Sequence, residues 1–184
     1  MKIVTIGSGN VGGGLGDRWE RAGHKVVRTG RAGGDASGAD AVLLAVPGAA
    51  VGDALASVTG LDAVPVIDAT NDFDGSATPE GFDSLAAYVK SLTRGPVAKS
   101  FNLNFARVYD RIDDQRVRPS SLYCADEEAR EVTERLIRDA GFEPVSAGDL
   151  SAAPLLEAHL RLMFGVNQAG LGPFFYRMAA PGEL

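Results

Sequence analysis

Three glycines near the start of the chain have the spacing of a phosphate-binding loop. Gly7, Gly9 and Gly12 form a Gly-x-Gly-x-x-Gly motif that follows the apolar run 3–6 and opens a helix-like stretch, 11–22. In such a motif the first glycine permits a tight turn, the second lets the backbone approach a pyrophosphate, and the third lets helix and strand pack closely. The helix N-terminus then offers N–H groups to the phosphates. The motif predicts a dinucleotide site, and an ordinary glycine-rich connection is the alternative.

The end of the predicted second strand indicates which dinucleotide binds. Sites for NAD place an acidic residue there, which accepts hydrogen bonds from the ribose 2′-hydroxyl. This chain instead has Arg28, Thr29, Gly30 and Arg31, and a guanidinium pairs well with a 2′-phosphate. Because Arg28 should point to the other face of the strand, Arg31 is the stronger phosphate ligand and NADP(H) is the predicted cofactor. In the alternative, the arginines are a solvated strand end and Asp35 binds the ribose.

Few residues are suited to acid–base or nucleophilic chemistry. His24 lies in the turn before the second strand and is expected to be solvated. His159 lies in the last predicted helix, where it either faces a cavity or lies on a surface or interface. Cys124 is expected to be a buried small residue because it lies in a strand-like run. No spacing suggests a metal site. We therefore predict no catalytic side chain, which is compatible with hydride transfer between two bound cofactors.

The elements that must position these residues alternate along the chain. The predicted strands are Ile3 to Ile6, Lys25 to Arg28, Ala41 to Val46, Val64 to Ala69, Pro96 to Ser100, Ser121 to Cys124 and Glu143 to Ser146. The predicted helices are Val11 to Ala22, Ala50 to Val58, Phe82 to Leu92, Glu127 to Ala140 and Ala153 to Phe164. Several strands are apolar at successive positions, as in a parallel sheet covered on both faces. This pattern predicts an α/β, Rossmann-like, doubly wound and mostly parallel sheet with ligands at its carboxyl edge.

Length and charge limit the organisation and the partners. The 184 residues suit a single domain, in which 151–184 is a short C-terminal segment that is helical and apolar. The formal net charge of -6 argues against a nucleic-acid surface. No charged-then-apolar leader and no long apolar span is found, so a cytoplasmic protein without a membrane partner is expected.

Three further segments have open interpretations. The polar loops 71–81 and 110–119 are either mobile flaps near a site or ordinary surface connections. The end of the chain, 162–178, is rich in large apolar residues. Such residues need cover, and they form a dimer contact, the wall of a substrate slot, or packing onto the protein's own core.

Taken together, the motifs resemble the family of coenzyme F420-dependent NADP oxidoreductases, which is related to the nucleotide domain of metalloreductases. The resemblance covers nearly the whole chain and rests on the glycine motif together with 29–31, 43–47, 67–71, 97–102, 123–129, 140–145, 147–152 and 155–157. It implies a single nucleotide-binding domain with a C-terminal helix, usually a dimer. It also implies hydride transfer between the nicotinamide C4 and C5 of an 8-hydroxy-5-deazaflavin.

The resemblance assigns site residues by position. The implied cofactor contacts are Gly7, Ser8, Gly9, Asn10, Val11, Gly12, Thr29, Gly30, Arg31, Val46, Pro47 and Ser100. The implied substrate contacts are Asn71, Phe101, Asn102, Asn167, Gly170 and Gly172. Asn71 and Asn102 are alternatively ordinary turn residues. Two features depart from the family. Gly30 stands where the family usually has a serine. The helix after the motif begins with the unusually glycine-rich run 12–16, which indicates either close packing or a loose first turn.

The sequence therefore predicts an NADP-dependent oxidoreductase that transfers a hydride between NADP(H) and a flavin-like carrier, with coenzyme F420 the first candidate. One alternative is a flavin or ferric-flavin reductase. Another, from a different class, is a non-catalytic NADP-binding module that senses redox state. An open planar slot beside the nicotinamide favours an enzyme, and a sealed one favours a sensor. Two-domain hydroxyacid and imine reductases share the first half of the pattern but need a longer helical C-terminal region.

Overall fold

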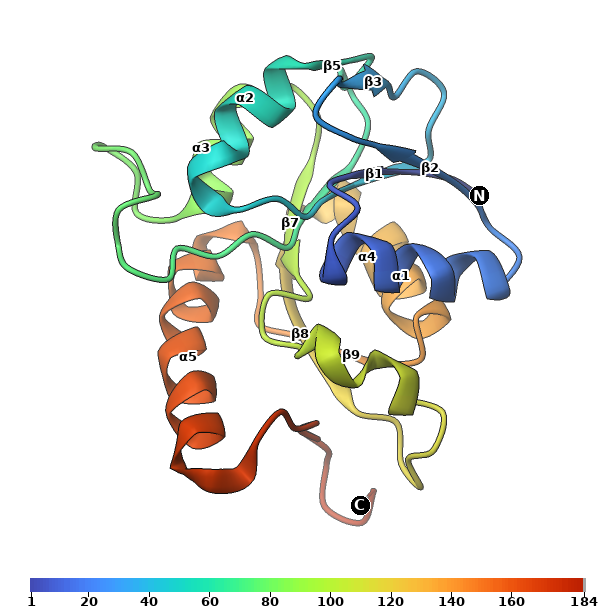
Figure 1. The fold of residues 1–184 in the computed structure, drawn as a ribbon, viewed down its shortest axis with the longest axis vertical. Helices are drawn as coiled ribbons and strands as arrows, with labels where there is room; N and C mark the ends of the chain where they lie inside the picture. Colours follow the sequence, from blue (N-terminus) through green and yellow to red (C-terminus); the bar gives the residue numbers. More distant parts are fainter. Residues whose placement is uncertain (184) are drawn as a thin grey trace.

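A seven-stranded sheet forms the centre of the computed structural model, which describes residues 1–183 (Figure 1). Its strands are β1 (Lys2–Ile6), β2 (Lys25–Thr29), β4 (Ala41–Leu44), β6 (Val66–Asp68), β7 (Val97–Ser100), β8 (Ser120–Ala125) and β9 (Glu143–Ser146). Their order is β2-β1-β4-β6-β7-β8-β9, and every pair is parallel except β7 with β8. The predicted Rossmann-like, mostly parallel sheet is confirmed.

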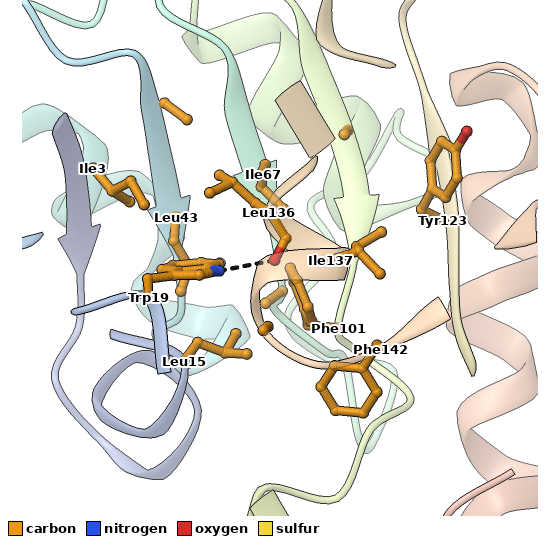
Figure 2. Packing of buried hydrophobic residues seen from close by; sticks show 14 of the residues in the cluster. Ile3, Leu15, Trp19, Leu43, Ile67, Phe101, Tyr123, Leu136, Ile137 and Phe142 are labelled. Atoms are coloured by element: carbon orange, nitrogen blue, oxygen red, sulfur yellow. Dashed lines mark hydrogen bonds between the residues drawn. The ribbon is translucent and has the colours of Figure 1, made fainter. Parts of the chain in front are cut away.

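Helices cover both faces of this sheet. They are α1 (Asn10–Arg21), α2 (Val51–Ala56), α3 (Leu85–Leu92), α4 (Glu127–Asp139) and α5 (Ala153–Val166). One apolar core lies beneath α1 and α4, where Trp19 donates a hydrogen bond to Leu136 O at 2.8 Å (Figure 2). A second core lies beneath α2 and α3, and α5 packs beside α3 against β8. The sheet is therefore buried on both faces, which explains its runs of consecutive apolar residues.

Several predicted boundaries were too generous. The predicted helix 50–58 is a 3₁₀ turn, η1 (Gly48–Ala50), followed by the short α2. The predicted helix 82–92 begins only at Leu85, because Ser84 caps it by accepting a hydrogen bond from Ala87 N. The small parallel pair β3 (Gly34–Asp35) with β5 (Val58–Thr59) was not predicted, nor were the 3₁₀ segments η2 (Ala106–Arg111) and η3 (Leu150–Ala152).

The glycine-rich start of α1 packs closely against its surroundings. A Cβ added to Gly12 would lie 2.0 Å from Gly7 O, and one added to Gly14 would lie 2.9 Å from the ring of Tyr109. A Cβ added to Gly16 would lie 3.1 Å from the guanidinium of Arg28. Of the two readings of these extra glycines, the structure therefore supports close packing.

The prediction of a solvated His24 was wrong. Its side chain is buried at the start of β2, and Nε2 lies 2.8 Å from Asp139 Oδ2 at the end of α4. The position in a turn suggested solvent, but the C-terminal end of α4 covers it. His24 therefore fastens α4 to the sheet and lies outside any site.

The C-terminal segment begins with η3 and α5 and continues beyond it. A wide π-type turn, η4 (Asn167–Leu171), extends α5 past the predicted end at Phe164. The chain then runs back along β8, where Ser120 N donates to Tyr176 O at 2.8 Å and Leu122 N donates to the Tyr176 hydroxyl at 3.0 Å. Leu184, the last residue of the predicted segment, lies outside the described residues. None of the helices in residues 1–183 is long and apolar enough to cross a membrane.

Candidate functional site

The glycine loop lies at the carboxyl end of β1, where the strand order reverses. The connection from β1 leads to β2 on one side, and β4 lies on the other side of β1, so this is the point at which α/β sheets bind ligands. Gly7 has φ +99°, and a Cβ there would lie 2.3 Å from Ala45 O. Gly7 therefore makes the predicted tight turn, and no other residue fits it without strain.

The start of α1 has the features of an anion site. Gly9, Ser8 and Asn10 are exposed, and nothing lies within 4 Å of the position of a Cβ on Gly9. No side chain in the described residues caps the first turn of α1, so its N–H groups are available to an external acceptor. The residues present therefore fit a pyrophosphate. The predicted cofactor contacts Val46 and Pro47 come just after β4, the strand that pairs with β1.

The two arginines near the end of β2 have different surroundings. Arg28 is held by α1, with ion pairs of 2.7 Å to Asp17 and 2.7 Å to Glu20. The hydrogen bonds that it donates to Glu20 lower the pKa of that carboxyl group below its ordinary value. Arg31 is exposed in the turn after β2 and forms no ion pair within residues 1–183. Of these two guanidinium groups, Arg31 is therefore the one available to a ligand.

The neighbours of Arg31 contribute less than predicted. The hydroxyl of Thr29 is buried and donates to Thr5 O at 3.1 Å, so its proton is already engaged. Gly30 closes the turn by accepting a hydrogen bond from Gly33 N at 3.0 Å. Asp35, the alternative ribose ligand, accepts one from Ser37 N at 2.9 Å, and hydrogen bonds to Ser37 lower the pKa of its carboxyl group.

A cavity of about 150 Å³ lies beside the N-terminus of α1. It is lined by Val11, Ala69, Asn71, Phe73, Phe101, Asn102, Leu103, Asn104, Phe105, Ala106, Leu160, Met163 and Phe164. None of these side chains is a carboxylate, histidine, lysine, arginine, tyrosine or cysteine. Apolar cavities of this size hold one ring the size of benzene. The space therefore suits a planar ring and offers amides and apolar contacts to it.

Two asparagines at the strand ends meet across this cavity. Asn71 Nδ2 donates to Asn102 O at 3.0 Å, and Asn102 Nδ2 donates to Asn71 Oδ1 at 3.3 Å. Phe101, between β7 and Asn102, has φ +62°, which is strained for a bulky residue. Strain of this kind costs about 1–3 kcal/mol and is found mostly at functional sites. Asn71, Phe101 and Asn102, which the resemblance assigned to a substrate pocket, are thus brought together.

Phenyl rings from four segments form a continuous row at the cavity. The ring centroids of Phe73 and Phe164 are 5.4 Å apart at an interplanar angle of 87°. Phe105 lies next in the row: its ring centroid is 5.7 Å from that of Phe164 and 5.3 Å from that of Phe174. Phe73 is 65% exposed and stands at the outer end. The row can therefore stack a flat ligand that enters from solvent.

Of the two polar loops, only 71–81 borders the cavity. Asp72 folds it by accepting hydrogen bonds from Gly75 N at 2.8 Å and Thr78 N at 2.9 Å. The loop 110–119 lies instead against α1, where Asp113 pairs with the buried Arg18 at 2.5 Å. It is therefore an ordinary surface connection.

A buried ion network supports the cavity from below. Lys99, which has no exposed surface, contacts Asp68 Oδ2 at 2.8 Å, Glu157 Oε1 at 2.9 Å and Thr70 O at 2.7 Å. Burial alone would lower the pKa of Lys99, but the two carboxylates outweigh it and raise the pKa above its ordinary value. Glu157 also accepts hydrogen bonds from the first N–H groups of α3, Leu85 N and Ala86 N. The network fixes the segment before Asn71 relative to α3 and α5.

Some predicted site residues lie elsewhere. Ser100 is fully buried, and its hydroxyl faces β8, 3.4 Å from Ser121 Oγ. Asn167, Gly170 and Gly172 lie in or just after η4, beyond Phe164, and do not line the cavity. His159 does not line it either. Residues 1–183 contain no group of three or more His, Cys, Asp or Glu side chains placed to hold a metal ion.

Cys124 is buried, as predicted. Burial raises the pKa of its thiol to about 11, so the thiolate is scarce at neutral pH.

The terminal apolar segment 162–178 packs partly onto the protein's own core and partly forms the wall of the cavity. Met163 and Phe174 pack with Leu103 in a small core, and Phe164 forms cavity wall, whereas Leu162 on the outer face of α5 is 58% exposed.

Several solved structures share the fold of this chain. A structure from Arthrobacter sp. FB24, described as "a putative F420 dependent NADP-reductase", superimposes with a TM-score of 0.77 over 98% of this chain and 100% of its own, at 21% identity. This chain shares its fold with NADP-binding reductases. A hypothetical protein from Sinorhizobium meliloti matches at TM-score 0.63 and 23% identity, over 83% of this chain and 87% of its own.

A larger enzyme shares the same fold. The reductive aminase of Aspergillus terreus, solved with NADPH and ethyl levulinate, matches at TM-score 0.68 and 19% identity, over 91% of this chain but 62% of its own. No protein-family model matches the sequence, and no match was found among curated proteins. The description of the Arthrobacter structure, which matches 98% of this chain, corresponds to the family that the sequence motifs resemble, and at 21% identity the likeness is one of fold.

Proposed function

We propose that this protein is an NADPH-dependent oxidoreductase that transfers a hydride between NADP(H) and a flavin-like carrier, with coenzyme F420 as the carrier. The observation that carries the proposal is the ring-sized cavity beside the N-terminus of α1, which has no acid or base in its lining. Hydride transfer between two bound rings needs orientation and exclusion of water but no protein proton donor.

The chain's own residues divide this work. The N–H groups at the start of α1 would hold the pyrophosphate, and Arg31 would bind the 2′-phosphate with charge-assisted hydrogen bonds. Bound NADPH would supply a hydride from its nicotinamide ring. Val11 and Phe101 limit water around that ring, and the amides of Asn71 and Asn102 orient it. The exposed Phe73 offers a face for stacking the larger carrier.

Two other functions make different predictions in one assay. Purified protein is mixed with NADPH and oxidised coenzyme F420, and the deazaflavin absorbance is followed. Bleaching supports the proposal. Bleaching of FMN but not of F420 would indicate a flavin reductase, and tight NADPH binding without reduction of any carrier would indicate a sensor. The row of phenyl rings that ends at the exposed Phe73 favours an enzyme over a sensor, because it leads from solvent to the cavity.

We also propose that the protein forms a homodimer through its C-terminal segment. Leu155 and Leu162 are two turns apart on α5 and are 72% and 58% exposed, and Leu171 in η4 is 63% exposed. The spacing of seven residues places Leu155 and Leu162 on one face of α5, and exposed large apolar side chains that share a face commonly mark an interface. Sedimentation of the wild-type protein should give the mass of a dimer, and Leu162→Glu should give that of a monomer. A wild-type monomer would refute this proposal.

A further inference from the structure

The side-chain amide of Asn102 has a fixed orientation. Its Nδ2 lies 3.3 Å from Asn71 Oδ1 and 3.3 Å from Leu156 O. Asn71 in turn uses its own Nδ2 to donate to Asn102 O, so its Oδ1 is the atom left to accept. The group of Asn102 that faces two acceptors must be the NH₂, because an oxygen there would have no donor. The carbonyl oxygen Oδ1 of Asn102 therefore points away from Asn71 Oδ1 and Leu156 O.

This oxygen is buried and has no hydrogen-bond partner within residues 1–183. Asn102 is 5% exposed and lines the ring-sized cavity. A buried acceptor without a donor is costly, and native structures seldom keep one without a reason. Asn104, in the same lining, shows the usual arrangement: its Nδ2 donates to Ser120 O at 3.0 Å, and its Oδ1 accepts from Ser121 Oγ at 2.8 Å. Asn102 therefore differs from Asn104 in having a side-chain oxygen that accepts no hydrogen bond from the described residues.

The strained residue before Asn102 supports a role for this arrangement. Phe101 adopts φ +62° although it is fully buried. This turn closes the end of β7, with Asn104 N donating to Phe101 O at 3.3 Å, and it presents Asn102 to the cavity. The surroundings hold a conformation that the residue itself disfavours, which is the pattern of a site arranged in advance for a ligand.

We propose that Asn102 Oδ1 is the acceptor for an N–H donor on the edge of a planar ring, of the carboxamide or imide class. This inference rests on the proposed function and names the atom by which the cavity recognises its ring. Two ligands carry such a donor. The nicotinamide ring has a carboxamide NH₂, and flavin-like carriers have an imide N–H. A ring that presents only acceptors to Asn102 would leave two oxygens facing each other.

The test compares ligands in which a methyl group takes the place of this donor hydrogen or amino group. For the nicotinamide, dissociation constants of NADP⁺ and of its acetylpyridine analogue are measured by calorimetry with the wild-type protein. The analogue replaces the NH₂ by a methyl group and keeps the 2′-phosphate. For the carrier, 8-hydroxy-5-deazariboflavin is compared with its derivative methylated at the imide nitrogen. Loss of a donor to a buried acceptor should weaken binding about 5- to 100-fold.

Variants assign the difference to Asn102. Asn102→Leu should remove the discrimination, because no acceptor remains, whereas Met163→Leu, a volume-conserving change in the same lining, should retain it. If Asn102→Leu does not fold, the ligand comparison in the wild-type protein still decides the question. Weaker binding of the acetylpyridine analogue identifies the nicotinamide as the partner, and weaker binding of the methylated carrier identifies the carrier.

Two results would overturn the proposal. The first is equal binding within both ligand pairs, and the second is a difference that persists unchanged in Asn102→Leu. Neither is confused with failure of the proposed function, which would appear as an absence of NADP⁺ binding or of carrier reduction in the wild-type protein.

Discussion

The glycine loop and the cavity beside it lie at the same edge of the sheet, yet the first is made by the backbone and the second by side chains. The loop comes from one short segment, 7–12, whose backbone packs so closely that a Cβ added to Gly12 would lie only 2.0 Å from Gly7 O. The cavity combines residues far apart in sequence, from Val11 through Asn71 and Asn102 to Phe164. The proposed phosphate-binding half, 7–12 together with Arg31, is therefore local, whereas the proposed ring-binding half, which is the lining of the cavity, depends on tertiary structure. These are called the phosphate half and the ring half.

This difference has a physical consequence for robustness. The ring half keeps its shape only while α3, α5 and the ends of β6 and β7 keep their positions relative to one another. The network of Lys99, Asp68 and Glu157 joins these four elements. Arg31, by contrast, lies in an exposed turn and needs only β2 to be in place. Changes to the network and to Arg31 should therefore affect different properties.

The largest effect is expected from Lys99→Met. The change leaves the carboxylates of Asp68 and Glu157 buried without their cation, so it should lower the free energy of unfolding by about 3–5 kcal/mol. Denaturant unfolding at pH 7 measures this. The triple variant with Asp68→Asn and Glu157→Gln should recover much of the loss, because no unpaired charge remains. A loss below about 1 kcal/mol would mean that the network does not hold the ring half together.

Where Lys99→Met remains folded, the comparison between the halves is sharpened by binding data. The preference for NADPH over NADH should be unchanged, because Arg31 is remote from the network. Carrier binding should weaken, because the segment before Asn71 loses the hydrogen bond from Lys99 to Thr70 O. Loss of the NADPH preference would show instead that the two halves are not built independently.

The intermediate effect tests the phosphate half. Arg31→Ala should weaken NADPH binding by about 1.5–3 kcal/mol and leave NADH binding nearly unchanged, because only NADPH has a 2′-phosphate. Arg28→Ala is the matched control, since its guanidinium is engaged by Asp17 and Glu20, and it should change neither affinity much. Fluorescence titration of both cofactors measures this. Equal losses for the two cofactors in Arg31→Ala would remove the assignment of Arg31 to the phosphate.

The sequence predicted the two halves unequally, for the same reason that separates them. The glycine motif and Arg31 are short-range signals, so their positions and the sheet that carries them were predicted. Asn71, Phe101 and Asn102 were assigned to a substrate pocket by the family resemblance, not by a local signal. Nothing local shows that Phe73 would pack on Phe164, because that contact depends on where α5 lies.

Other misses also arise from contacts between distant segments. The position of His24 in a turn predicted a solvated side chain, but the end of α4 covers it. Lys99 and its two carboxylates lie in motifs that the sequence singled out, but their burial and pairing appear only when β6, β7 and α5 come together. A lysine inside the apolar run 97–100 was the one available signal, because a buried cation requires a partner.

The smallest effect tests how far the ring half extends toward solvent. Phe73 is mostly exposed and contacts Phe164 edge to face, so Phe73→Ala should cost little stability. If its ring stacks on the carrier, the Michaelis constant of the carrier should rise by about 0.5–1.5 kcal/mol in equivalent free energy, while the dissociation constant of NADPH stays constant. Leu92→Ala, which removes another exposed apolar side chain outside the cavity lining, should change neither. An unchanged carrier constant in Phe73→Ala would end the ring half at Phe164, and an equal change in NADPH binding would mean that Phe73 serves both ligands.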